Sequence, residues 1–275
     1  MPFVAISCES CGGSVAMPAG QRHPTCLFCG AASLIEKAPP EGAPVPATYV
    51  PFVLDEGHAR DVFKAWAKER FWAPAEIREA RVDLNDLLLP AWTWSGLVET
   101  HWAALVPAAG TRSGKRPRSG EDSMRVDGML VLASQTLRRA ELAAISPFDG
   151  SSEVAFETET TTVPYELGSL TRRAATAQAH TQMRGQHAAQ IGNQTDASRL
   201  STSCLFREMD GKPLLLPVWI GAYRVGEKMY RVVLNGQSGE LTGTAPISWI
   251  KVLGALAAGT LALAVLAGVA SALGG

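Results

Sequence analysis

Four of the five cysteines stand in two matching patterns near the start of the chain. Cys8 and Cys11 form one C-x-x-C-G motif, and Cys26 and Cys29 form another. Two cysteines at this spacing can point both sulfurs at one metal ion, and the following glycine permits the tight turn that aims backbone N–H groups at the thiolates. The two motifs together predict a structural zinc site closed by four thiolates, which folds a segment too small for its own core.

Two other readings of these cysteines stay open, namely a different metal and a redox-active dithiol pair. His23 lies between the motifs, but four thiolates suffice, so we expect it to be a bystander. Cys204 stands alone in a predicted strand and is expected to act as a small buried apolar residue. Thiolate metal ligands suit a reducing compartment better than disulfides would.

No other cluster of residues has the pattern of a catalytic or cofactor-binding site. The basic loop 110–118, GTRSGKRPR, lacks the spacing and the Ser or Thr of a phosphate-binding loop, so we expect solvated cations there. His180 and His187 stand seven apart without an acidic partner at ligand spacing, and solvent exposure is expected for both. Glu157 and Glu159 are two residues apart on a predicted strand, so they share one face of it, and we interpret that face as exposed to solvent. The sequence therefore predicts a protein that is not an enzyme.

The elements around the cysteines predict an α+β protein with an added membrane helix. Helical spacing of apolar residues predicts a helix over Ala59–Arg70, and shorter or polar helices are expected at Gln135–Ala144 and Tyr165–Ile191. We divide the chain into a zinc ribbon (1–36), a Pro/Ala-rich linker (37–48), an α+β soluble body (49–246) and a C-terminal membrane anchor (247–275). Because prolines favour an extended linker, the ribbon is expected to be tethered and to fold separately.

One apolar phrase occurs twice in the predicted body. Leu87–Gly96 reads LLLPAWTWSG and Leu214–Tyr223 reads LLLPVWIGAY. We interpret each copy as a buried strand that opens a hairpin, with Trp92 and Trp219 in equivalent places. The copies could pair in one sheet or form two related substructures, and similar composition alone is the plain alternative.

Turn residues set the expected hairpins. Val98–Val106 is expected to pair with the first copy, and Pro107–Asp127 is expected to be a polar loop before a strand at Met129–Ala133. In the second half, Arg199–Met209, Pro213–Val225 and Lys228–Leu234 are predicted strands. Turns are expected at Asp210-Gly211, Gly226-Glu227 and Asn235-Gly236.

The C-terminal tail has the composition of a membrane span. Residues 252–273 contain no charge and no proline. A helix of this length extends about 33 Å, enough to cross a hydrocarbon core of about 30 Å. Trp249 and Lys251 precede it, as is typical at the level of lipid headgroups. The alternatives are a buried Ala-rich helix and a re-entrant hairpin.

The N-terminus lacks the features of a signal peptide, and two residues follow the predicted span. We therefore expect a single-pass, tail-anchored protein of the cytoplasmic membrane, with most of the chain in the cytosol.

The order of these motifs resembles a known family. The resemblance rests on the two C-x-x-C-G motifs, YVPFVLDEGHARDVFKAWAKERFWAP at 49–74, both Pro-x-Trp phrases, and YRVVLNGQSGELTGTAPISWIK at 230–251. It covers nearly the whole length and is similar to bacterial TFIIB-type zinc-ribbon membrane proteins, often labelled primosomal or helicase-like. It implies partners such as PspA-like or SPFH-domain proteins in envelope-stress modules. No nucleotide-binding motif supports the helicase label.

Two functions and a remote third follow from these features. The first is a membrane-anchored adaptor or scaffold that binds protein partners at the cytoplasmic membrane face, possible contexts being envelope stress and membrane remodelling. The second is a nucleic-acid-associated zinc-ribbon factor of the replication or transcription type. A formal net charge of −1 and the scarcity of basic and aromatic residues near the cysteines favour the first. An enzyme with a novel site has no support in the residues.

Overall fold

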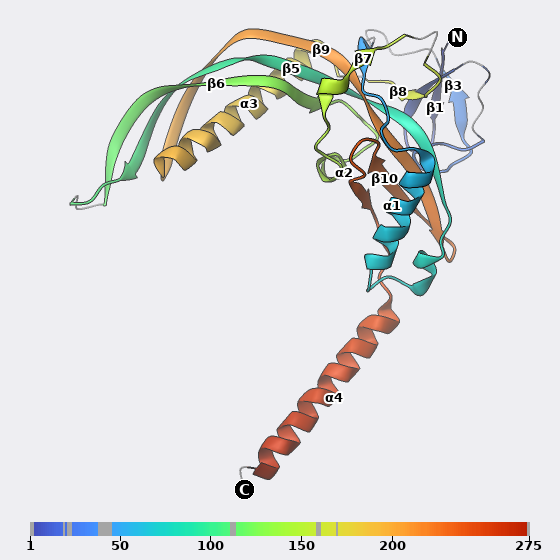
Figure 1. Cartoon of the computed structure of the whole chain (residues 1–275). Helices are drawn as coiled ribbons and strands as arrows, with labels where there is room; N and C mark the ends of the chain where they lie inside the picture. The colour runs from blue at the N-terminus through green and yellow to red at the C-terminus, as the bar shows by residue number, and fades with distance from the viewer. Residues whose placement is uncertain are drawn as a thin grey trace.

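One large mixed sheet organises the protein, with helices on both of its faces (Figure 1). The computed structural model describes residues 3–18, 20, 24–37, 46–110, 114–157, 161–168 and 170–273, the last without the side chains of 261, 262 and 264–273. Its strands are β1 (Phe3–Cys8), β2 (Ser14–Pro18), β3 (Leu34–Glu36), β4 (Thr48–Tyr49), β5 (Val82–Pro107), β6 (Lys115–Leu132), β7 (Val154–Ala155), β8 (Tyr165–Glu166), β9 (Arg199–Val225), β10 (Lys228–Asn235) and β11 (Leu241–Gly243). Its helices are α1 (Glu56–Glu69), α2 (Arg139–Ala144), α3 (Arg172–Thr195) and α4 (Trp249–Leu273), with short 3-10 turns η1 (Ala75–Arg78) and η2 (Gly150–Ser152). The predicted α+β class is confirmed.

The order of strands in the sheet is β11-β10-β9-β5-β8-β2-β1-β3. β6 pairs with β5 beyond the point where β8 ends, and β4 joins β9 and β7. The strands of the predicted zinc ribbon thus continue the sheet of the body through the pairing of β2 with β8. The ribbon therefore shares a sheet with the body instead of folding separately as expected, while residues 38–45 of the predicted linker lie outside the described residues.

The predicted turn at Gly226-Glu227 joins β9 to β10 as expected, but two very long strands replace two other predicted hairpins. β5 has 26 residues and β9 has 27, and they pair antiparallel over almost their whole length. The predicted turn between Trp94 and Val98, and that at Asp210-Gly211, are therefore wrong. A Cβ at Gly211 would lie 2.4 Å from the Trp94 ring, and one at Gly96 would lie 2.5 Å from Met209. These glycines make room for neighbouring side chains instead of reversing the chain.

The polar loop expected at 107–127 is also wrong over most of its length, because Lys115–Leu132 form strand β6. β6 is an edge strand whose described residues pair only with β5. Most of its side chains are at least partly exposed, so the strand lacks the apolar alternation that would have identified it.

The repeated phrases lie opposite each other at the centre of the sheet. Leu89 pairs with Leu216, and these are equivalent positions of the two copies, 127 residues apart. A local two-fold axis therefore passes between them. Leu88 pairs with Pro217, and Pro90 pairs with Leu215, as this symmetry requires. Of the open alternatives, pairing of the two copies in one sheet is confirmed.

The two prolines occupy equivalent gaps in the outer pairing of the long strands. Pro90 lies between the residues that pair with β8 and β6, and Pro217 lies between those that pair with β4 and β10. The carbonyl of Pro90 accepts from the Ala133 N–H, and that of Pro217 accepts from the Gly236 N–H, both at 2.9 Å. No neighbouring strand needs a hydrogen bond from the backbone nitrogen at these two positions. Proline, which has no N–H, is therefore tolerated inside the sheet.

The helices repeat in the same way. The Trp219 indole donates to the carbonyl of Leu54 at 3.0 Å, and the Trp92 indole donates to that of Leu170 at 3.2 Å. Each accepting residue stands directly before the N-cap of a helix, α1 or α3. Buried helix positions recur 116 residues apart, namely Ala59 and Ala175, Phe63 and Ala179, and Ala67 and Met183. The body is thus built from two β–α–β–β units, 48–133 and 165–236, whose tryptophans each reach across to the helix of the other unit.

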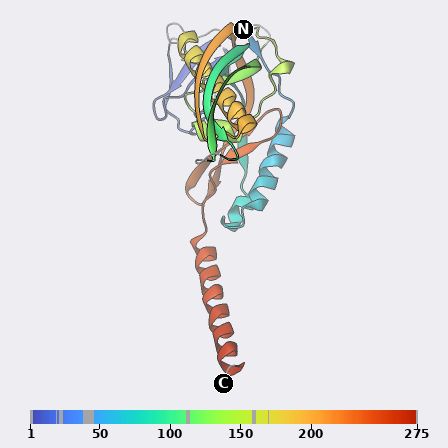
Figure 2. The ribbon, with the colours of Figure 1, turned by 90° about the vertical axis from the view of Figure 1, so that its left-hand side faces the viewer.

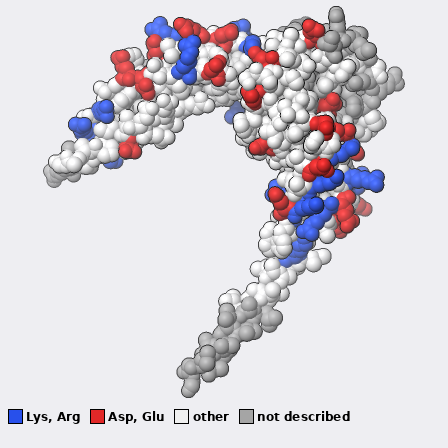
Figure 3. Space-filling model, in the orientation of Figure 1, with Lys and Arg blue, Asp and Glu red and all other residues white. Residues whose placement is uncertain are grey.

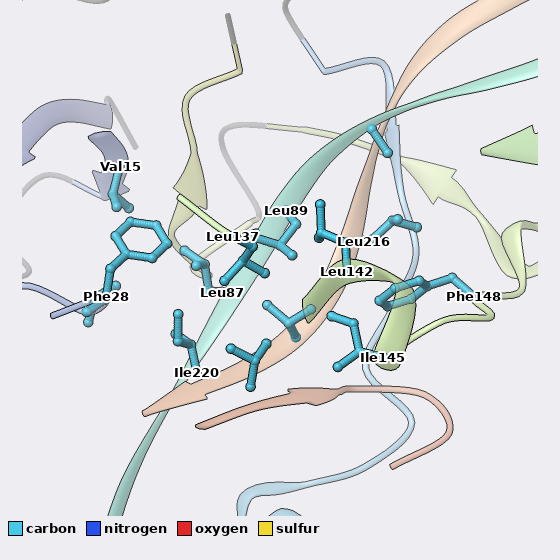
Figure 4. Packing of buried hydrophobic residues seen from close by; sticks show 14 of the residues in the cluster. Val15, Phe28, Leu87, Leu89, Leu137, Leu142, Ile145, Phe148, Leu216 and Ile220 are labelled. Carbon is cyan, nitrogen blue, oxygen red and sulfur yellow. The ribbon is translucent and has the colours of Figure 1, made fainter. Parts of the chain in front are cut away.

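The faces of the sheet carry separate cores. Trp219 and Tyr223 pack on α1, while Trp92, Trp94 and Val98 pack on α3. The opposite face carries Leu87, Leu89, Leu216 and Ile220, which pack against α2 and the N-terminal segment that holds the four cysteines (Figure 4). Figure 2 shows α3 lying along the curved strands and α4 extending away from the body.

Candidate metal centre

The two cysteine motifs fold into matching knuckles. The Gly12 N–H donates to the Cys8 carbonyl, and the Gly30 N–H donates to the Cys26 carbonyl, each at 2.9 Å. The glycines have φ values of +75° and +74°, a left-handed conformation that side chains disfavour. The turn therefore requires glycine after the second cysteine of each motif, as the sequence indicated.

The knuckles bring the four sulfurs to one point. All four Sγ atoms lie within 4.8 Å of one another. Cys8 Sγ is 3.7 Å from Cys29 Sγ, and Cys11 Sγ is 3.7 Å from Cys26 Sγ. Four sulfurs around a metal at about 2.3 Å in tetrahedral geometry would be separated by about 3.8 Å. The predicted ligands Cys8, Cys11, Cys26 and Cys29 are close together in an arrangement compatible with a metal site.

The thiols differ in how readily they ionise. Burial opposes ionisation of Cys8, but N–H groups of Cys11 and Ser10 and neighbouring thiols outweigh it and lower its pKa to about 7. Burial raises the pKa of Cys26 to about 12, although N–H groups of Phe28 and Cys29 partly compensate. Burial also raises the pKa of Cys11. A divalent cation among the sulfurs would supply the charge needed to hold all four as thiolates.

The centre has a buried side and a solvent side. Cys8 and Cys26 are buried against the body, whereas Cys11 and Cys29 are exposed. Phe28, inside the second knuckle, is 2% exposed and belongs to the largest core of the body. A Cβ at Gly13 would lie 2.7 Å from the Phe28 ring, so that glycine allows the ring to lie against the first knuckle. Packing therefore couples the metal site directly to the body.

The remaining candidates from the sequence are separated in the structure. Lys115, Arg116 and Arg118 of the basic stretch lie on β6 rather than in a loop, while residues 111–113 lie outside the described residues. His23 and Glu159 also lie outside them, and Glu157 is exposed, as expected. The described members of this set do not converge on one site.

The expected exposure of the two histidines is wrong, because α3 packs its histidine face onto the sheet. His180 is partly buried, and its ring stacks on Phe206 with centroids 3.9 Å apart. His187 is fully buried, and its Nδ1 is 2.9 Å from Thr100 Oγ1. Its Nε2 lies 3.5 Å from an Asp122 carboxylate oxygen without a hydrogen bond.

A row of polar side chains crosses the sheet beneath His187. Thr100 pairs with Asp122 on β6 and with Cys204 on β9, and Cys204 Sγ is 3.2 Å from Thr100 Oγ1. Cys204 is partly buried, close to its expected role. The sequence did not reveal this group, since its members are scattered over 105 positions and meet only through strand pairing.

The buried carboxylate of Glu166 is a second polar group that the sequence did not reveal. Glu166 is 1% exposed, and one of its carboxylate oxygens accepts from the N–H groups of Gln135 and Thr136 and from the Thr136 hydroxyl. Its other oxygen has no partner among the described residues. Burial raises its pKa, and these donors offset only part of that effect. Glu166 fastens the segment before α2 to the strand that joins the ribbon to the body.

The predicted span 252–273 forms most of α4, but many of its side chains lie outside the described residues. Within the described part of the chain, none of the helices combines the length and apolar character that a membrane crossing requires.

No protein-family model matches the chain, and no curated protein or solved structure matches it either. The resemblance to TFIIB-type zinc-ribbon membrane proteins thus stays a prediction.

Proposed function

We propose that the chain is a zinc-containing, membrane-anchored adaptor that binds protein partners at the cytoplasmic face of the membrane. The observation that carries this proposal is a projecting arm made of β6, β5 and the first half of β9 (Figure 1). α3 covers one face of the arm, and no strand among the described residues pairs with the outer edges of its two outer strands.

The open edges suit recognition of an extended partner segment. Within the described residues, β6 and the Arg199–Asp210 part of β9 pair only with β5. Such edges present unpaired backbone donors and acceptors, to which another chain can add a strand. Pro117 has no N–H, and the Ser123 N–H donates to the Asp122 side chain instead of to β5. Alternate β6 residues from 117 to 123 therefore direct their N–H positions away from β5.

In this proposal the metal is zinc and its role is structural. Four thiolates complete a tetrahedral zinc site and leave no position for a substrate or reactive water. The ion would hold the knuckle that carries Phe28 against the body core. Zinc therefore supports the scaffold from which the arm projects.

The anchor in this proposal is α4. The helix has 25 residues, and from residue 252 to residue 273 it contains no charged side chain. Leu253, Leu256 and Leu263 are all more than half exposed, which is costly in water but favourable in lipid. The resemblance to the zinc-ribbon membrane family supports this arrangement and suggests PspA-like or SPFH-domain partners.

Partner binding is tested by purifying the full chain from cells in mild detergent and identifying its partners by mass spectrometry, with and without nuclease. The variant pair Ser119→Pro and Glu121→Pro places prolines where N–H groups point outward, so β5–β6 pairing is preserved. The matched controls are Ser119→Ala and Glu121→Ala. We expect the proline variants to lose protein partners that the alanine variants retain. A set of partners that depends on nucleic acid would instead favour the nucleic-acid hypothesis.

The anchor is tested separately by carbonate extraction of membranes and by protease protection in vesicles of both orientations. The full chain should resist carbonate, and its body should be cleaved only in inverted vesicles. Leu263→Arg, at the middle of the predicted span, should weaken this resistance, since a central arginine costs about 2.5–3.5 kcal/mol in a span. A full chain that carbonate releases would contradict the anchor.

A further inference from the structure

Large exposed apolar side chains gather at the base of α4. Five of them lie on two segments that meet there, and we call this set the collar. Its members are Phe71 (65% exposed), Trp72 (48%), Ile247 (59%), Trp249 (71%) and Ile250 (85%). They come from two segments, the turn after α1 and the entry to α4, which are far apart in the sequence.

Hydrogen bonds fix these two segments to each other. The Ser248 N–H donates to the Trp72 carbonyl at 2.7 Å. The Lys251 ammonium donates to the carbonyls of Phe71 and Ala73 at 2.9 and 2.6 Å, and it lies 5.7 Å from the centre of the Phe71 ring. The first turn of α4 is therefore attached to the body, and the collar is a defined surface.

We propose that the collar rests in the headgroup layer of the bilayer that α4 enters, so that the body sits on the lipid surface in a fixed orientation. This inference rests on the proposed anchor. A Trp at the water–lipid boundary buries its apolar ring while its indole N–H stays hydrated, and Phe adds apolar surface beside it. The partner is lipid because the exposed side chains are continuous with the uncharged helix, and because Lys251 supplies a cation at the same level.

Charged residues near the collar are of both signs. Figure 3 shows cations between the body and the start of α4, and Lys68, Arg70, Arg78 and Arg81 belong to the neighbouring segments. Glu69, Glu76 and Glu79 lie in the same stretch. The proposal therefore depends on the apolar collar and makes no claim for a particular headgroup charge.

The tryptophans provide a direct test. Of the seven in the chain, Trp66, Trp92, Trp94, Trp102 and Trp219 are at most 9% exposed, which leaves Trp72 and Trp249 accessible. The full chain is reconstituted into phosphatidylcholine vesicles whose acyl chains carry bromine close to the headgroups, and quenching of fluorescence is measured. Trp72→Phe and Trp249→Phe should each remove roughly half of the quenching, because each removes one of two indoles at the lipid boundary. The double variant should lose nearly all of it.

The outcomes separate the collar from the anchor. If Trp249→Phe abolishes the quenching and Trp72→Phe leaves it unchanged, the anchor stands and the collar proposal is overturned. If neither substitution alters quenching and the full chain does not co-float with the vesicles in a density gradient, both proposals fail. Far-ultraviolet circular dichroism of each variant confirms that the conservative Phe replacements keep the fold.

Discussion

Loss of a single metal ligand should destabilise the whole body, and Cys26→Ser is the change that tests this. The ribbon shares a core with β5, β9 and α2, so it cannot leave without exposing that core. A tethered ribbon would behave differently, since it would unfold alone. The two arrangements therefore predict different stabilities for the same variant.

The magnitude follows from the side chains that the ribbon buries. Val15, Met17, Leu27 and Phe28 are buried in the shared core. Burying one such side chain contributes about 1.5–3 kcal/mol, so undocking all four costs about 6–12 kcal/mol as an upper value. The total stability of a domain is about 5–15 kcal/mol. Removing the metal should therefore cost a large part of the stability of the body.

The assay is urea unfolding of the full chain in detergent, followed by tryptophan fluorescence. All seven tryptophans lie outside residues 1–36, so fluorescence reports on the body and not on the ribbon itself. Cys26→Ser should unfold at much lower urea than the unmodified chain, and addition of a metal chelator to the unmodified chain should produce the same shift.

The matched control is Cys204→Ser, since this cysteine lies outside the knuckles and a serine hydroxyl can keep its contact with Thr100. It should leave the transition nearly unchanged. If Cys26→Ser also leaves the fluorescence transition in place, the ribbon is energetically independent and our reasoning about the shared core is refuted.

Three further outcomes are expected. Elemental analysis of freshly purified protein should find one zinc per chain, and an absence of zinc would contradict the proposed metal. Trp92→Ala and Trp219→Ala should each lower the free energy of unfolding by about 3–5 kcal/mol, whereas exposed Trp72→Ala should change it by less than about 0.5 kcal/mol; equal effects would argue against the paired-unit core. Burial raises the pKa of Glu166 in the folded state, so the stability it contributes is fully present below its unfolded pKa and is lost as pH rises through the raised folded value. Glu166→Gln should flatten this part of the stability–pH curve measured by urea unfolding, and an unchanged slope would assign the effect to another group.

The sequence alone determined the features that depend on neighbours along the chain. Cys8, Cys11, Cys26 and Cys29 could be assigned together because knuckle geometry depends on spacing and on the glycine that follows. α1 was predictable from its apolar spacing and begins at the N-cap residue Asp55, whose side chain accepts from the His58 N–H. The repeated Pro-x-Trp phrase also marked the two central strands correctly.

Only the tertiary structure decided which distant segments meet. Gly211 suggested a turn and Gly96 falls between two strands that were expected to form a hairpin, yet each glycine is enclosed by side chains of a neighbouring strand that local sequence cannot reveal. β6 escaped detection because an edge strand, solvated along most of its length, needs no apolar alternation. The burial of His187 and the docking of the ribbon depend on contacts between residues dozens of positions apart. Such contacts form when strands pair and faces pack, and that pairing is set by the whole chain rather than by any one segment of it.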